Sequence, residues 1–111
     1  MFRRLATATL LAIAFASPAL SGEAKHRLAI HVDQNDPQLM NLALNNATNV
    51  IEYYRGKNEE VEVDIVTYGP GLHMLRSDTS PVQDRLKRLK ELAFPSKIQF
   101  SACNNTRQGM A

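Results

Sequence analysis

The single cysteine, Cys103, has the clearest potential for chemistry in this sequence of 111 residues. It follows the segment Lys97–Ala102, which is predicted as a strand, and it precedes Asn104-Asn105-Thr106, which is typical of a helix start. Free backbone N–H groups and the helix dipole at such a start favour a thiolate over a thiol. The position therefore predicts a reactive cysteine, and the alternative is a small buried apolar side chain.

Other kinds of site are excluded or poorly supported. One cysteine cannot form a disulfide within its own chain or a C-x-x-C zinc or redox pair. The three histidines are scattered without an i, i+4 pair, so no metal site is expected. No G-x-G-x-x-G motif or P-loop Lys-Ser/Thr is present, and no cofactor is expected.

The strand ends suggest which side chains surround Cys103. In open α/β sheets, ligands bind beyond the carboxyl ends of the strands, where the strand order reverses. If the first strand lies between the second and third (order 2-1-3), His31 and Asp33 lie near Cys103. His73, in the loop after the second strand, could reach the same crevice. The alternatives are a hydrogen-bonded core histidine at 31 and an ordinary loop histidine at 73. The predicted crevice is completed by the helix-start residues Asn104, Asn105 and Thr106.

The first half of the chain predicts a strand and a helix. Leu28–Val32 is an apolar run that is typical of a buried strand, while His26 is expected in a disordered tail. Asp36 and Pro37 are a helix cap and a first helical residue. An apolar stripe continues this helix to Arg55, and Gly56 is expected as a left-handed cap.

The second half repeats the pattern. Residues 61–66 predict a strand, and the alternation of Glu62 and Asp64 with apolar residues places it nearer the sheet edge than the first. A Gly-Pro-Gly loop and a short helical turn at residues 72–75 follow. The next helix is expected to begin with Ser80 as cap and to end before Pro95. Its solvent face is predicted to carry the basic cluster Arg85, Lys87, Arg88 and Lys90.

This βαβαβ order predicts an α/β fold with a parallel sheet, right-handed crossovers and helices on both faces. Residues 1–21 have the basic start, apolar run and small residues of a secretory signal peptide, with cleavage expected before Gly22 and a second possible site at Ala14-Phe15-Ala16. The alternative is a membrane anchor, but the apolar segment at residues 5–20 is shorter than the roughly 20 residues that a span needs. Removal of Arg3 and Arg4 lowers the basic count from 13 to 11, equal to the 11 acidic residues. We therefore expect a near-neutral domain at residues 22–111, periplasmic or secreted, that binds neither nucleic acid nor membrane.

Three segments resemble the DsrE/DsrF-like family, and in particular its small exported members. They are residues 42–49 (LALNNATN), residues 66–75 (VTYGPGLHML) and residues 102–106 (ACNNT). The resemblance implies a flavodoxin-like sheet of order 2-1-3-4-5 and assembly into trimers or hexamers. It also implies a sulfur carrier that holds a persulfide on a cysteine, and Cys103 matches that cysteine. The family continues through further strands beyond the end of this chain, so a C-terminally incomplete domain is expected.

The predicted function is therefore sulfur handling. Cys103 would carry sulfane sulfur as a persulfide and exchange it with thiol or persulfide donor and acceptor proteins. The alternative is a non-catalytic module of the same fold that binds a small ligand or a protein.

Overall fold

The computed structural model describes residues 26–110. In that part of the chain the element order is β1 (His26–Val32), α1 (Pro37–Arg55), β2 (Val61–Thr67), the 3-10 helix η1 (Gly69–Leu75), α2 (Gln83–Ala93), β3 (Lys97–Ala102) and α3 (Asn104–Gly109). The predicted α/β class and βαβαβ order are confirmed. The predicted signal peptide at residues 1–21 lies outside the described residues.

The three strands form one parallel sheet of order β1-β2-β3. Leu28 pairs with Val63, and Val63 pairs with Ile98 on its other side. The predicted order 2-1-3 is therefore wrong, because β2 rather than β1 is the central strand. The continuous apolar run of β1 did not indicate a central position, since β1 lies at an edge and most of its residues are exposed.

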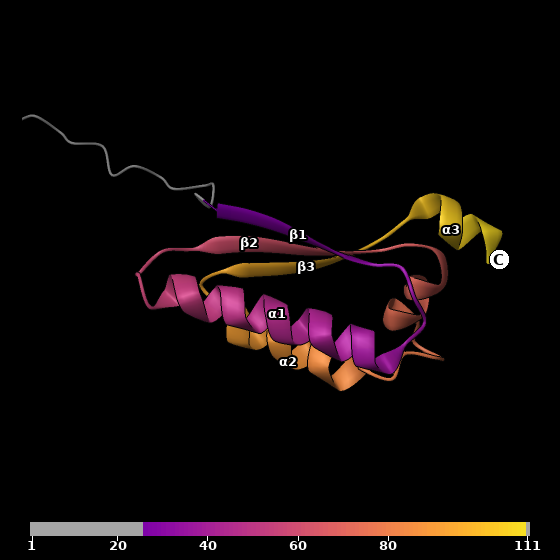
Figure 1. Ribbon diagram of the computed structural model, residues 1–111, viewed down its shortest axis with the longest axis horizontal. Coiled ribbons are helices and arrows are strands. Elements are labelled where there is room, and N and C mark those ends of the chain that lie inside the picture. The colour runs from indigo at the N-terminus through magenta and orange to yellow at the C-terminus, as the bar shows by residue number, and fades with distance from the viewer. Residues whose placement is uncertain (1–25, 111) are drawn as a thin grey trace, which may run out of the picture.

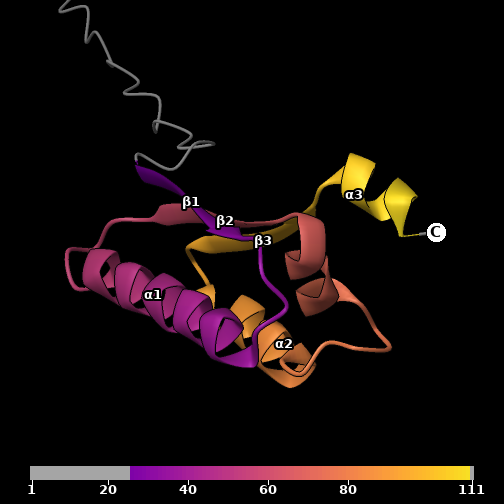
Figure 2. The same ribbon diagram turned by 45° about the vertical axis from the view of Figure 1, so that its right-hand side comes forward.

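Both long helices cover the same face of the sheet (Figures 1 and 2). Two right-handed crossovers that advance in one direction, from β1 to β2 to β3, place their helices on one side. The residues of β2 that face the helices are all buried: Val61, Val63, Ile65 and Thr67. The expectation that helices cover both faces is not met within residues 26–110.

The opposite face of the sheet is polar. Asp64, at its centre, accepts hydrogen bonds from Ser101 Oγ at 2.8 Å and from Gln99 Nε2 at 3.4 Å. Further along, Arg27 Nε lies 3.7 Å from Glu62 Oε2. The alternation of acidic and apolar residues in β2 therefore marks an uncovered face of a central strand, not an edge strand.

Helix α1 has the predicted bounds. The side chain of Asp36 accepts a hydrogen bond from the N–H of Gln38 at 2.9 Å, and Pro37 occupies the first turn. Its buried residues pack on the sheet and on α2: Met40, Ala43, Leu44, Ala47 and Ile51. The predicted left-handed cap at Gly56 is wrong, since its φ is −62°. Asn58, with φ 56°, adopts the left-handed conformation instead, which asparagine tolerates better than most residues.

Helix α2 begins later than predicted. Val82 occupies the N-cap position, and its N–H donates to Ser80 Oγ at 3.3 Å. The Gln83 side chain donates to the carbonyl of Arg76 at 2.9 Å, so it does not close a capping box. Three of the basic residues are exposed as predicted, whereas Arg85 is half-buried against α1.

Among residues 26–110, no helix has both the length and the apolarity that crossing a membrane requires.

His26 is part of β1 rather than a tail. Its Nε2–H donates to Glu59 Oε2 at 2.6 Å, and its ring stacks on Tyr54 with centroids 4.0 Å apart. These contacts attach the start of β1 to the end of α1 and to the loop that precedes β2.

Candidate functional site

Cys103 lies where β3 passes into α3. Its backbone N–H donates to the carbonyl of Thr67 at 2.9 Å, which extends the pairing of β3 with β2 by one residue. Its own carbonyl accepts from the N–H of Arg107 at 3.0 Å, the first hydrogen bond of α3. Cys103 is thus the N-cap residue of this short helix, and it is partly exposed.

Thr106, one turn into α3, connects the helix to η1. Its hydroxyl oxygen accepts a hydrogen bond from the backbone N–H of Gly69 at 2.9 Å. The hydroxyl hydrogen is not used in that bond, so it remains able to point toward another acceptor. The backbone N–H and the hydroxyl of Thr106 both lower the pKa of the nearby Cys103 thiol.

The pKa of the Cys103 thiol is lowered from its ordinary value. The backbone N–H of Thr106 is the largest cause, followed by the Thr106 hydroxyl, and the backbone N–H of Asn105 contributes less; partial desolvation opposes them. The side chain of Cys103 makes no capping hydrogen bond of ordinary geometry. The helix start therefore favours the thiolate over the thiol.

The strand order changes the neighbours expected for Cys103. Because β2 lies between β1 and β3, the end of β1 with His31 and Asp33 is one strand removed from the cysteine. His31 is exposed on the uncovered face of the sheet, so it is not a core histidine, and its ring stacks on Tyr68 with centroids 4.1 Å apart. Asp33 is exposed as well.

The other residues predicted to line the crevice differ in whether they influence the cysteine. His73 lies in η1, where its Nδ1 is hydrogen-bonded to Thr79 Oγ1 at 2.8 Å. Asn104 Oδ1 accepts from Arg107 Nη2 at 2.9 Å, and the side chain of Asn105 is exposed. Of the six crevice residues predicted from the sequence, Thr106 and the backbone of Asn105 influence the pKa of the Cys103 thiol.

Gly69 and Gly71 not only end the strand but also position the site. Gly69 has φ +53°, a conformation that glycine adopts without strain. A Cβ on Gly71 would lie 2.1 Å from the carbonyl oxygen of Val32, so η1 can fold against the end of β1 only with glycine there. Two glycines around a proline directly after a strand were the signal for this close approach.

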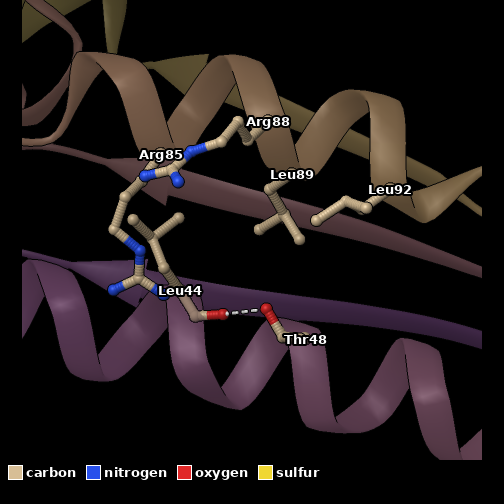
Figure 3. A pocket seen from close by; sticks show the side chains of 6 residues that line it. All are labelled: Leu44, Thr48, Arg85, Arg88, Leu89 and Leu92. Atoms are coloured by element: carbon tan, nitrogen blue, oxygen red, sulfur yellow. Dashed lines mark hydrogen bonds between the residues drawn. The ribbon is translucent and has the colours of Figure 1, made fainter.

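No three histidine, cysteine, aspartate or glutamate side chains within residues 26–110 are arranged to hold a metal ion. The hollow drawn in Figure 3 is lined by residues of α1 and α2 and does not include Cys103. The chemistry available at the cysteine is therefore that of a thiolate supported by hydrogen bonds at a helix start.

No protein-family model matches this sequence, and no curated protein matches it. A solved structure is similar, that of MTH1491 from Methanobacterium thermoautotrophicum, a protein of unknown function. The two chains are 26% identical, with a TM-score of 0.64, over 77% of this chain and 68% of the other. This similarity supports the parallel α/β fold and assigns no activity.

Proposed function

We propose that this chain is a member of the DsrE/DsrF-like family and carries sulfane sulfur as a persulfide on Cys103. The observation that carries the proposal is the position of Cys103 at the N-cap of α3, where Thr106 and Asn105 lower the pKa of its thiol. The resemblance of residues 66–75 and 102–106 to the family supports the same role. Partial exposure of the cysteine supports access by a partner thiol.

Loading the carrier is a thiol exchange. The Cys103 thiolate attacks the outer sulfur of a donor persulfide, R–S–SH, and the S–S bond of the donor breaks. The donor leaves as R–S⁻, and Cys103 becomes Cys–S–SH; the donor thiolate then takes its proton from solvent. The sulfane sulfur passes from one thiol to another, with no net oxidation.

Unloading repeats the exchange in the other direction. An acceptor thiolate attacks the outer sulfur of Cys103–S–SH, a new S–S bond forms on the acceptor, and Cys103 departs as a thiolate. A thiol of lower pKa is the better leaving group in such exchanges. The hydrogen-bond donors of Thr106 and Asn105 therefore favour release as well as loading.

We also infer the setting in which the carrier works. The export signal predicted at residues 1–21 supports a periplasmic or secreted protein, whose donor and acceptor are thiol proteins of that compartment. The family resemblance supports assembly into trimers or hexamers.

Intact-mass measurement tests the proposal. Folded protein incubated with inorganic polysulfide should gain one sulfur atom, about 32 Da, and Cys103→Ala should gain none. Addition of a small thiol should return the wild type to its original mass. Circular dichroism on the same samples establishes that both proteins are folded. Folded wild type without an adduct would refute the proposal and favour the alternative, a binding module with an inert cysteine.

A further inference from the structure

A second surface feature lies between the two helices that cover the sheet, on elements that do not contribute to the cysteine site. It is a hollow of about 230 Å³ with walls from both helices (Figure 3). Its lining residues are Leu44 and Thr48 of α1 and Arg85, Arg88, Leu89 and Leu92 of α2. Leu44 and Leu89 are buried and form its apolar floor, whereas Leu92 is 64% exposed at its rim.

Arg85 is held in place at one end of this hollow by neutral groups. Its Nη1 donates to Asn41 Oδ1 at 2.6 Å, and its Nη2 donates to Asn45 Oδ1 at 2.8 Å. Amide oxygens orient a guanidinium group without neutralising its charge. The Nε–H makes no hydrogen bond within residues 26–110, so a fixed cationic donor remains available there.

Arg88 adds a second positive charge to the same hollow. It is exposed, and within the described part of the chain it makes no hydrogen bond, ion pair or ring contact. Figure 3 shows Arg85 and Arg88 toward one end of the hollow and Leu89 and Leu92 along the other. Two guanidinium groups that have no acidic partner among the described residues thus adjoin a leucine wall.

A second exposed apolar side chain lies at the end of α2. Phe94, just after α2, is 80% exposed, and the carbonyls of Leu92 and Phe94 both accept hydrogen bonds from Arg55 Nη2. The helix end that carries these two side chains is therefore attached to α1. Single exposed apolar residues are common in soluble proteins, and of these two only Leu92 lines the cationic hollow.

We propose that this α1–α2 hollow docks an acidic amphipathic helix of a partner protein. A leucine-type side chain would occupy the apolar floor, and carboxylates would pair with Arg85 and Arg88. A volume of about 230 Å³ is below the usual 300–1,000 Å³ of small-molecule pockets, so it suits an anchoring side chain better. The lining contains no aromatic ring on which a nucleic-acid base could stack, which favours a peptide over RNA or DNA.

Peptide binding to the full chain tests this inference. The probe is a fluorescein-labelled helical peptide with leucines at i, i+4 and i+7 and glutamates beside them; the control peptide has lysines in place of the glutamates. Fluorescence anisotropy should show binding of the acidic peptide only. Arg88→Glu should weaken that binding roughly tenfold or more, and Leu92→Gln should weaken it severalfold. Both side chains are exposed, so neither variant should unfold the protein.

Lys87→Glu is the matched control, because Lys87 lies on the same helix but does not line the hollow. It makes the same change in charge and should alter the affinity by less than about twofold. Equal losses in Arg88→Glu and Lys87→Glu would overturn the inference, as would equal binding of both peptides or no binding of the acidic one. Tighter binding of a labelled single-stranded DNA would overturn it too. Cys103→Ala should bind the peptide normally, which separates this test from that of sulfur transfer.

Discussion

The backbone N–H of Gly69 donates to the side-chain oxygen of Thr106 at 2.9 Å, across 37 positions of sequence. This bond connects the turn after the central strand to the helix that follows the third strand. It also leaves the hydroxyl hydrogen of Thr106 available to the sulfur of Cys103. The local conformation after β2 therefore contributes to the ionisation of a cysteine that follows another strand.

Replacement of Thr106 should make the cysteine less reactive. In Thr106→Val the hydroxyl donor is lost, so the pKa of Cys103 should rise, with a smaller thiolate fraction at neutral pH and severalfold slower alkylation. The pH dependence of the iodoacetamide rate measures this shift. Thr106→Ser should behave as wild type, and so should Asn105→Ala, which keeps its backbone N–H. Identical profiles for Thr106→Val and wild type would show that the hydroxyl has no influence on the thiol.

Gly71→Ala should destabilise the fold strongly. The added Cβ would lie 2.1 Å from Val32 O, a backbone atom that cannot move without displacing the end of β1. We expect a loss of about 3 kcal/mol or more in the free energy of unfolding, measured by urea denaturation. Gly109→Ala is the control, because a Cβ there meets nothing within 4 Å. That variant should stay within about 0.5 kcal/mol of wild type or gain slightly. Similar stabilities for the two variants would contradict the close approach of η1 to β1.

Two leucines of α1 should differ sharply in their contribution to stability. Leu44 is fully buried against the sheet and α2, whereas Leu42 on the same helix is 53% exposed. Leu44→Ala should cost about 3 kcal/mol and Leu42→Ala less than about 1 kcal/mol, measured by urea denaturation. Equal losses would mean that α1 presents a different face to the sheet.

The carboxyl group of Asp78 should titrate unusually low. Arg76 donates to it from Nη2 at 2.7 Å and from Nε at 2.9 Å, and this pairing lowers the pKa of Asp78 from 3.8 to about 2. A lowered pKa means that the pair favours the folded state above about pH 4, and that this contribution disappears as the pH falls toward 2. In Arg76→Gln the carboxyl pKa should return toward 3.8, as followed by carbon NMR. Arg88→Gln should leave it unchanged. An ordinary pKa of Asp78 in the wild type would disprove the pairing in solution.

Much of the fold could be predicted because its signals are local. The cap at Asp36, Pro37 and the apolar stripe predicted both bounds of α1 correctly. The bounds of β3, Lys97–Ala102, were also predicted correctly. The strand order could not be obtained in this way, since it depends on which strands pair. The alternation of Glu62 and Asp64 reports which faces of a strand are covered, and it does not report how many neighbours the strand has.

In the candidate site, too, the local features could be predicted from the sequence and the contacts between distant segments could not. Cys103 and Thr106 were predicted together because they belong to one turn of helix. The proximity of Gly69 to Thr106 depends on the position of β2 beside β3, so sequence spacing alone could not indicate it. The prediction that His31 and Asp33 lie near Cys103 relied on the order 2-1-3. In the observed order β2 separates them from the cysteine.

Both ends of the edge strand β1 are held by contacts outside the sheet. At one extremity His26 is bound to Glu59 and stacked on Tyr54, and at the other Val32 accepts from the N–H of Tyr68 and lies against Gly71. Because both ends are held, we expect β1 not to fray from one end but to separate from β2 as one cooperative segment. The amide protons of β1 that are hydrogen-bonded to β2 should consequently exchange with solvent at a shared opening free energy, despite the exposure of most of its side chains. The N–H groups on its outer edge, which have no strand beside them among the described residues, should exchange faster.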